Sequence, residues 1–368
     1  METKEISARN LRCLIILLVL CGSVMSGVFT LMQDAWLAVL MMGVLFLPAL
    51  LIYSRLCSLF PGKNLYEIIE NVFGPVLCAV ITFLLTVYPL FVTSLMLRNF
   101  LEFTVVIALQ QTPEIPLMFV LMGTVWYLAH HGVTLLGRWS IIVCSIILLN
   151  VALTIVLSLN VIDISHIQPI MDHSVAQIAG DAFSLGSIVL GETMMVMVLM
   201  GYLKKGESPY RVYLPGMLAG IGVFVLIVLR NLLILGPDMV KAAKFSTYMA
   251  VRVIHLGHFF ERIESSISFI FILLGITKMT LFLTAASMGT ARLMKEKDYK
   301  QLLVPMGLLA IALCSIMFKN VFELYDFALV YRYLALPFQL LLPMAIWITA
   351  EIKLRKQKNQ QNAQPAIP

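Results

Sequence analysis

The sequence is poor in charge, since Asp, Glu, Lys and Arg together make up only 12% of its 368 residues. Soluble domains carry about 25% charged residues. At the same time, 60% of the residues are hydrophobic and the mean hydropathy is +0.94. A soluble fold cannot bury this much apolar surface. The composition therefore excludes a soluble protein and indicates an integral membrane protein.

Several patterns of metal-binding and catalytic proteins are also missing from the sequence. The six cysteines form no Cys-x-x-Cys pair and do not gather in one segment, which argues against a disulfide framework or a metal site. The chain contains neither G-x-S-x-G nor H-E-x-x-H, the motifs of serine hydrolases and zinc peptidases. We therefore expect no enzyme activity, no cofactor and no metal ion.

What the chain has instead is a series of long apolar runs. A helix needs about 20 apolar residues to cross a bilayer. Runs suited to this cover residues 13–31, 36–54, 76–97, 116–131, 140–160, 177–202, 213–235, 263–286, 303–318 and 333–350. Because they are continuously apolar rather than alternating in polarity, they indicate helices and not a β-barrel. We predict an all-α integral membrane protein with about ten transmembrane helices.

The predicted helices leave no room for a soluble domain. We expect one polytopic membrane domain over residues 1–353 and a polar, disordered cytoplasmic tail over residues 354–368. Lys and Arg residues set the orientation, because they stay preferentially on the cytoplasmic side during insertion. With both termini inside, seventeen of them lie in inner loops and seven in outer loops. Both termini are therefore expected in the cytoplasm, and the first run is expected to be an uncleaved helix.

Two of the apolar runs contain glycine and hydroxyl residues at mid-depth. They are residues 21–27 (CGSVMSG) in the first span and residues 180–187 (GDAFSLGS) in the sixth, where Gly191-Glu192 follow. These spans begin two five-helix halves, at about residues 10–160 and 175–352. Paired interruptions of this kind are typical of 5+5 inverted-repeat transporter folds, with helices 1 and 6 broken around a midplane site. The alternative is that small residues simply allow helices to pack closely.

A broken helix offers free N–H groups, which favour an anion, and free carbonyl groups, which favour an ammonium ion. A free amino acid carries both charges. We therefore predict that the first span binds a carboxylate and that the carbonyls of residues 183–185 bind an ammonium group. The predicted ligand-binding residues are Gly22, Ser23, Ser26, Gly27, Phe183, Ser184, Leu185, Gly186 and Ser187.

Ionisable side chains at membrane depth are expensive to bury, so each is a functional candidate. Glu192 and Lys278 both lie about 5 Å on the cytoplasmic side of the bilayer centre, at about 1.5 Å per helical residue. We predict that they form an ion pair, which is either a permanent structural pair or a device for proton or cation coupling. Arg230, in the outer part of the seventh span, is expected to extend its side chain to the outer interface.

Four motifs carry a resemblance to a known family. They are Asp34-Ala35-Trp36-Leu37 at the start of the second span, LFPGKNLYE at residues 59–67, Tyr88-Pro89 in the third span, and Glu261-Arg262-Ile263-Glu264 at the start of the eighth. Through them the chain resembles the B subunit of GerA-type spore germinant receptors, the spore permease branch of the amino acid/polyamine/organocation superfamily. The resemblance implies ten spans in a transporter-like fold, A-type and C-type partner subunits, and the inner membrane of the dormant spore.

Two functions remain open at this point. The resemblance implies a nutrient-sensing subunit that binds a small molecule, such as a free amino acid, and triggers germination. The alternative is an autonomous amino acid permease coupled to protons or another cation. Nucleic-acid binding is not needed to explain the net charge of +6, because the basic inner loops lie beside anionic lipid.

Overall fold

The computed structural model describes residues 5–24, 31–105, 112–243, 245–253, 264–318 and 321–363. In these ranges the chain is helical almost throughout and forms no strand, apart from an isolated bridge between Ile6 and Leu203. The α-helices are α1 (Ala8–Val24), α2 (Ala35–Leu59), α3 (Leu65–Val72), α4 (Pro75–Phe103), α5 (Glu114–His130), α6 (Val133–Ser158), α7 (Val175–Val189), α8 (Tyr210–Ala242), α9 (Ser246–Arg252), α10 (Glu264–Met294), α11 (Leu303–Met317), α12 (Val321–Leu336) and α13 (Leu342–Ala363). Shorter 3-10 and π segments are η2 (Met32–Asp34), η4 (Ile164–Ile167), η5 (Gly191–Val198), η6 (Met200–Tyr202), η8 (Tyr299–Leu302) and η9 (Pro337–Leu341).

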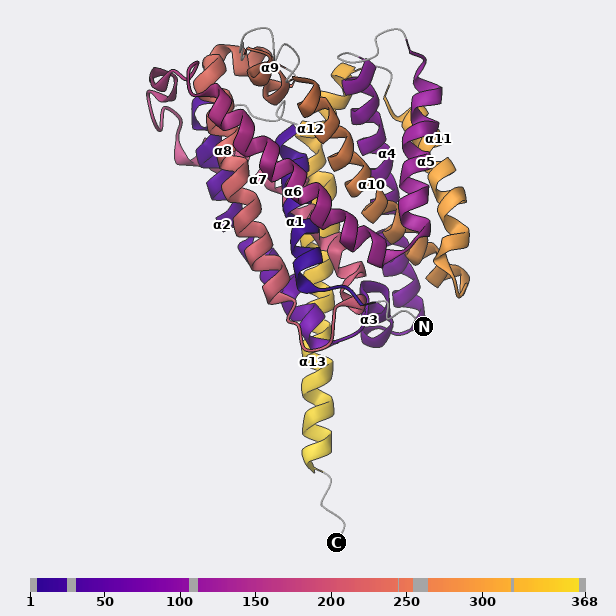
Figure 1. The fold of residues 1–368 in the computed structure, drawn as a ribbon. Coiled ribbons are helices and arrows are strands. Elements are labelled where there is room, and N and C mark those ends of the chain that lie inside the picture. The colour runs from indigo at the N-terminus through magenta and orange to yellow at the C-terminus, as the bar shows by residue number, and fades with distance from the viewer. Residues whose placement is uncertain are drawn as a thin grey trace.

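The long helices form one bundle (Figure 1). In this view α1 begins and α13 ends at the lower end of the bundle, while the short helix α9 lies at the upper end. We call these the lower and upper ends below. Both described ends of the chain therefore lie on one side of the bundle.

Eight helical stretches of the described residues are long and apolar enough to cross a membrane. The chain is thus an all-α, multi-pass membrane protein, as its composition predicts. Helix α5 is apolar but shorter, and α1 has 17 residues. Each of the ten predicted runs overlaps one of these helices. The number of ten spans and the division into two inverted halves stay predictions.

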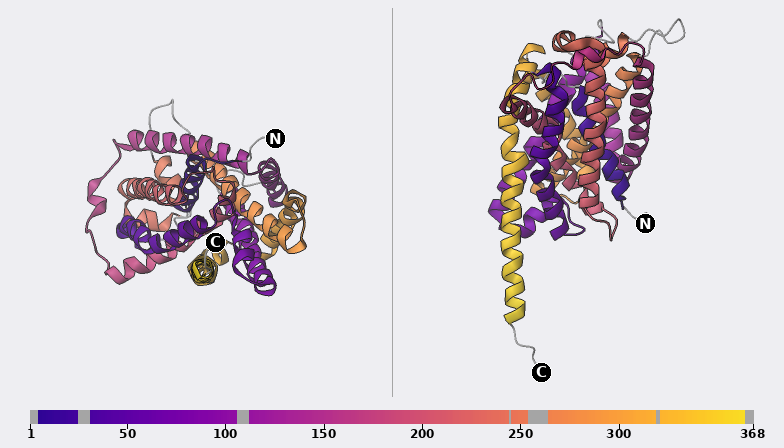
Figure 2. Two further views of the ribbon diagram at one scale, coloured as in Figure 1. Left: turned by 90° about the horizontal axis from the view of Figure 1, so that it is seen from below. Right: turned by 90° about the vertical axis from the view of Figure 1, so that its left-hand side faces the viewer.

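Two of the candidate spans are central and one is peripheral. The most apolar window of α10 is 83% buried and that of the α7–η5 stretch is 89% buried, compared with 28% for the stretch that ends in α13. Figure 2 shows α13 at the edge of the bundle. The hydroxyls of Thr277, Thr280 and Thr284 donate to carbonyls four residues earlier, each at 2.7 Å. The central helix α10 therefore carries polar side chains that its own backbone satisfies.

The interruption of the sixth span lies at Gly191-Glu192 and not within residues 180–187. Helix α7 is regular through residues 180–187, and the helical geometry changes from α to 3-10 only at Gly191. Ser184 and Ser187 donate their hydroxyls to carbonyls within the helix, so their presence does not break it. A methyl group added to Gly186 would overlap the ring of Phe46. Gly186 therefore allows α7 to pack closely against α2, as small residues do in membrane helices, and does not interrupt its own helix.

The predicted disordered tail is helical over most of its length, because α13 continues to Ala363. Its last part is rich in Lys, Arg and Gln, which are good helix formers as well as polar residues. Residues 354–360 are exposed or half-buried, so the helix extends beyond the bundle (Figure 2). A polar composition alone therefore does not separate an exposed helix from a disordered tail.

Candidate functional site

The middle of the bundle holds a buried pair of opposite charges. Glu192 lies in the first turn of η5, Lys278 lies in α10, and each residue is only 2% exposed. The ammonium group of Lys278 contacts Oε2 of Glu192. The structure thus brings together the two charges that the sequence places at the same membrane depth. A buried carboxylate and ammonium in contact offset each other's charge, which makes both tolerable in an apolar bundle.

A chain of hydrogen bonds ends on the same carboxylate. The hydroxyl of Tyr331 in α12 donates to Oε1 of Glu192 at 2.7 Å. The hydroxyl of Tyr88 in α4 lies 2.9 Å from that of Tyr331 and accepts from Nε2 of Gln339 at 2.7 Å. Because the proton of Tyr331 is committed to Glu192, Tyr88 must donate to Tyr331. Every donor in the chain therefore points toward the carboxylate, an arrangement that stabilises its ionised form.

Gln339 connects this network to the α7 helix. Besides bonding to Tyr88, its Nε2 donates to the backbone carbonyl of Ser187 at 2.6 Å. A methyl group added to Gly191 would overlap the same amide unless Gln339 moved, so this glycine lets the amide pack closely where η5 begins. The change of helical geometry, the amide and the charge pair therefore form one continuous site.

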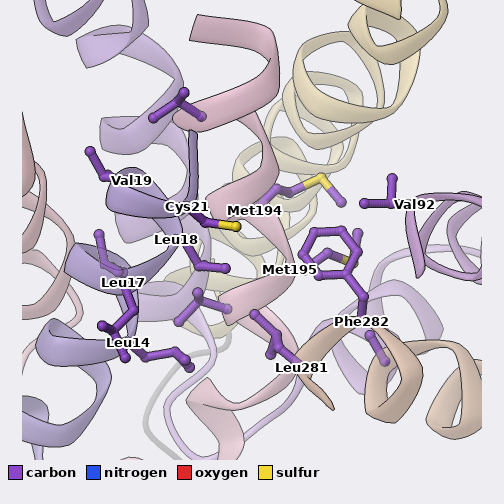
Figure 3. Packing of buried hydrophobic residues seen from close by; sticks show 14 of the residues in the cluster. Leu14, Leu17, Leu18, Val19, Cys21, Val92, Met194, Met195, Leu281 and Phe282 are labelled. Carbon is purple, nitrogen blue, oxygen red and sulfur yellow. The ribbon is translucent and has the colours of Figure 1, made fainter. Parts of the chain in front are cut away.

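The charge pair is surrounded by apolar side chains. Figure 3 shows Leu18 and Cys21 of α1 on one side of η5 and Phe282 of α10 on the other, with Met194 and Met195 on η5 itself. All five side chains are buried, and the ring centroid of Phe282 lies 6.0 Å from the ammonium nitrogen of Lys278. Charges in such surroundings are little screened, so they interact more strongly than they would in water.

The predicted ligand-binding residues of the first span lie against this site only in part. Gly22 is in α1, where an added methyl group would overlap Val189 of α7. Ser23 belongs to α1 by its backbone. Ser26 and Gly27 lie outside the described residues. The close contact of α1 with α7 at Gly22 is therefore the part of the first-span prediction that the structure describes.

Two of the five predicted ligand-binding residues of the sixth span line a small cavity between α2, α7 and α12. Phe183 and Ser187 face this cavity of about 40 Å³, together with Arg332 and Gln339. Ser184 accepts a hydrogen bond from Nη1 of Arg332 at 2.6 Å. The side chains of this face thus meet a guanidinium group, which attracts a carboxylate rather than an ammonium ion.

The two remaining residues of the predicted set have packing roles. Leu185 is buried in the core, and Gly186 packs on Phe46, whose ring lies 5.9 Å from that of Phe183. The carbonyl of Gly186 accepts from the backbone N–H of Leu190. This carbonyl belongs to a regular helix and is already paired.

Tyr88, Tyr331, Gln339 and Arg332 are site residues that reasoning from single spans missed. Gln339 and Arg332 were visible as polar residues near the tenth apolar run, but the sequence does not show which helix they face. A tyrosine fits a membrane core as well as an interface, so its hydroxyl gives no signal of its own. In the sequence, Tyr88 stands out only as part of the Tyr88-Pro89 motif.

A second polar contact joins the start of α2 to the segment before α7 near the upper end. Asp34 is fully buried and accepts from the backbone N–H groups of Met171 at 2.9 Å and His173 at 3.1 Å. Nδ1 of His173 lies 2.9 Å from the same carboxylate. Burial raises the pKa of Asp34, but these hydrogen bonds outweigh it and hold the pKa below its ordinary value. The first residue of the Asp34-Ala35-Trp36 motif thus connects the two halves of the sequence.

Arg230 is buried and does not extend to the outer interface, so that expectation was wrong. The residue is 3% exposed, and its Nη1 and Nη2 donate to Thr154 Oγ1 at 2.6 Å and Asn231 Oδ1 at 2.8 Å. Asn231 in turn donates to Thr247 of α9 at 2.9 Å. Thr154 of α6 and Asn231 of α8 thus give the guanidinium group polar partners inside the bundle, and α9, which packs against α8, supplies a partner for Asn231.

The chain matches the model of one protein family, described as spore germination protein, over residues 5–322. It is similar to spore germination protein KB of Bacillus subtilis (strain 168), with 26% identity over 372 residues that cover 98% of both chains. It is also similar to the putative spore germination protein YfkT of the same organism, with 22% identity over 87% of this chain and 88% of that one.

The fold is shared with a solved transporter. The structure of Mhp1, a nucleobase-cation-symport-1 family transporter in a closed conformation with bromovinylhydantoin bound, superposes with a TM-score of 0.61. The superposition covers 91% of this chain and 76% of the transporter, at 13% sequence identity. At this identity the likeness concerns the fold alone.

Proposed function

This chain belongs to the spore germination protein family, and we propose that it is the nutrient-sensing membrane subunit of a spore germinant receptor. One observation carries the proposal. The buried Glu192–Lys278 pair lies where the sixth span leaves α-helical geometry, within a fold shared with a transporter. Ionisable residues at this depth mark functional sites in membrane proteins. Interrupted helices near the midplane are where transporter folds bind their substrates.

We propose that the ligand is a small molecule such as a free amino acid and that it binds between the first and sixth spans. The cavity at Phe183 and Ser187 supports the sixth-span side of this site, because Arg332 offers a guanidinium group beside it; the walls of the cavity come from α2, α7, α12 and η9. We assign the ligand's carboxylate to Arg332, in place of the ammonium group that the sequence alone suggested for this face. The proposed first-span contacts remain Gly22, Ser23, Ser26 and Gly27.

Ligand entry must be accompanied by movement of helices. The cavity of about 40 Å³ is little larger than the space of one water molecule, which is about 30 Å³. An amino acid fits only if α7 moves relative to α2 and α12. Such a movement displaces Ser187, whose carbonyl accepts from Gln339, and so reaches the hydrogen-bond chain on Glu192. We propose that ligand occupancy is transmitted to the charge pair by this route.

The proposal extends to partners and location. We propose that the chain acts with A-type and C-type subunits in the inner membrane of the spore, as the resemblance to germinant receptors implies. The lower end of the bundle, with both chain ends, is proposed to face the cytoplasm. The excess of Lys and Arg in loops on that side supports this orientation.

A second candidate function is that of an autonomous amino acid permease. The fold shared with a transporter favours it, and a buried carboxylate–ammonium pair is a suitable device for proton coupling. Uptake separates the two functions. A permease accumulates its substrate without partner subunits, whereas a sensor needs them and acts through germination.

The test uses two assays on the same variants. Spores that carry the wild-type chain, Arg332→Gln or Arg55→Gln as their own copy are exposed to each of the twenty amino acids, and germination is followed by the fall in optical density. Arg55 is the control, because its side chain is 47% exposed and pairs with Glu351 at the lower end. We expect wild-type and Arg55→Gln spores to respond and Arg332→Gln spores to lose the response.

The second assay reconstitutes the purified chain alone in liposomes and measures uptake of each labelled amino acid. A sensor is expected to show no accumulation. Accumulation driven by a proton or cation gradient would establish the permease and contradict the sensor. An unchanged germination response of Arg332→Gln would contradict the assigned carboxylate site while leaving the sensor role intact.

A further inference from the structure

Among the residues that the structure describes, Arg230 is a buried cation without an anionic partner. It is 97% buried in the upper half of α8, and its described contacts are with the neutral side chains of Thr154 and Asn231. The other buried cations are compensated: Lys278 contacts Glu192, and Arg98 pairs with Glu102 and Glu114. No ion pair of Arg230 occurs in the part of the chain that the structure describes. Neutral hydrogen bonds do not offset the desolvation of a guanidinium group.

A cavity of about 30 Å³ lies beside this guanidinium group. It is bounded by Arg230 of α8, Thr247 of α9, Asn150 of α6 and Leu20 of α1, with Ile267 and Leu274 of α10 closing its apolar side. About 10–15 Å³ of such space is enough to hold one water molecule, so the cavity has room for water or a small ion. It excludes a whole amino acid. The cavity therefore has a cation in its wall, room for a small occupant and otherwise mostly apolar surroundings.

The polar groups around the cavity are suited to an anion. Oγ1 of Thr247 accepts from Nδ2 of Asn231 at 2.9 Å, which leaves the hydroxyl proton of Thr247 available to donate. Nδ2 of Asn150 bonds to Ser266 Oγ at 2.9 Å, while its Oδ1 has no hydrogen-bond partner. Rotating the amide of Asn150 by 180° exchanges Oδ1 and Nδ2. Oδ1 can then accept a hydrogen bond from Ser266, and Nδ2 replaces the unpaired oxygen with an N–H donor. Three side chains from three helices can then donate to one occupant.

From the unpaired charge, the cavity and these donors, we propose that a small monovalent anion binds beside Arg230, either a halide or the carboxylate group of a small organic acid. The occupant supplies a negative charge that no described residue of the chain places there. Because it contacts α6, α8 and α9 and lies against Leu20 of α1, its presence stabilises the position of the first span at the upper end. The site is separate from the proposed nutrient site at α7 and does not depend on the proposed function.

The experiment is anion-dependent thermal stability of the purified full chain. Unfolding is followed in detergent at constant ionic strength with sodium gluconate, chloride, bromide, formate or acetate. Gluconate is the reference, because it is too large for the cavity. Relative to gluconate, we expect a saturable rise in Tm of several degrees with the halides chloride and bromide, with the carboxylates formate and acetate, or with both groups. A rise with halides alone identifies an inorganic ion, and a rise with carboxylates alone identifies the headgroup of an organic ligand. ³⁵Cl NMR line broadening reports halide binding directly.

The variants decide whether the effect belongs to this cavity. We expect Arg230→Gln to abolish the anion-dependent rise and Thr247→Val, a milder change, to increase the anion concentration at half-saturation severalfold. Arg98→Gln is the matched control, because Arg98 is also buried near the upper end but has two carboxylate partners; it is expected to keep the rise. Equal Tm values in all salts, or an unchanged rise in both Arg230→Gln and Thr247→Val, would overturn the proposal and leave water as the occupant.

Discussion

Two buried cations, Lys278 in the middle of the bundle and Arg230 near its upper end, are stabilised in opposite ways. Lys278 contacts the carboxylate of Glu192, whereas Arg230 bonds only to the neutral side chains of Thr154 and Asn231. A buried charge is tolerated when an opposite charge accompanies it. The comparison teaches that the central charge is compensated within the chain, while the upper one has no counter-ion among the described residues. Mutations at the two sites should therefore have different consequences.

The largest effect is expected from breaking the central pair on one side. Lys278→Met leaves the Glu192 carboxylate buried without its counter-ion, which should lower the free energy of unfolding by about 3–5 kcal/mol. Denaturant or thermal unfolding of the purified chain in detergent measures this. The matched control is the double variant Glu192→Gln/Lys278→Met, which buries no charge and should recover most of the stability. A fully stable single variant would show that the pair is not buried as described.

A smaller loss is expected when the carboxylate keeps its ammonium partner but loses a hydrogen bond. Tyr331→Phe removes the hydroxyl that donates to Glu192 and to which Tyr88 donates. A hydrogen bond to a charged group contributes about 1.5–3 kcal/mol, so the free energy of unfolding should fall by that amount. In the double variant Glu192→Gln/Lys278→Met, Tyr331→Phe should lower the free energy of unfolding by less than it does in the wild-type chain. An equal loss in the two proteins would show that the hydrogen bond from Tyr331 is not strengthened by the charge of Glu192.

Removing the upper cation should cost less than breaking the central pair. Arg230→Gln removes the hydrogen bonds to Thr154 and Asn231 and leaves no carboxylate unpaired. We therefore expect the free energy of unfolding to fall by about 1–2 kcal/mol. The measurement is made in gluconate, so that no small anion adds to the wild-type stability. A loss as large as that of Lys278→Met would mean that Arg230 has an anionic partner within the chain.

The smallest effect is expected at Asp34, a buried charge outside the candidate spans. Its hydrogen bonds lower its pKa, so its contribution to stability is fully present above the ordinary carboxylate pKa of about 4 and is lost as the pH falls through the lower folded value. Asp34→Asn keeps one acceptor oxygen and should cost about 1 kcal/mol at pH 7. The difference from wild type should shrink below about pH 4. A difference that grows on acidification would contradict this account.

The membrane fold and the positions of the helices could be predicted from the sequence, because each span is a long apolar run. The contact between Glu192 and Lys278 was also within reach, since both are charges at one calculated depth. Their hydrogen-bond partners were not, because facing helices cannot be inferred from single spans. Tyr331 and Gln339 reach the site only through the packing of α12 and η9 against α7.

For a related reason, the sequence does not show which of the glycines in the sixth span marks the break. Glycines favour both an interruption and close helix packing, and only the neighbouring helix decides between them. Gly186 packs on Phe46 within a regular helix, while Gly191, next to the amide of Gln339, begins the 3-10 segment. Arg230 was misjudged in the same way, because its partner Thr154 lies on another helix, α6, and its partner Asn231 donates in turn to Thr247 of α9.

The central claim is that the Glu192–Lys278 pair takes part in sensing and does not only support the fold. The most direct test is the germination response of spores that carry Glu192→Gln/Lys278→Met, with the abundance of the chain measured by immunoblot. The account predicts wild-type abundance and a lost nutrient response, because the uncharged pair preserves packing but cannot respond to ligand. Wild-type abundance with a wild-type response would contradict the claim and reduce the pair to a structural role.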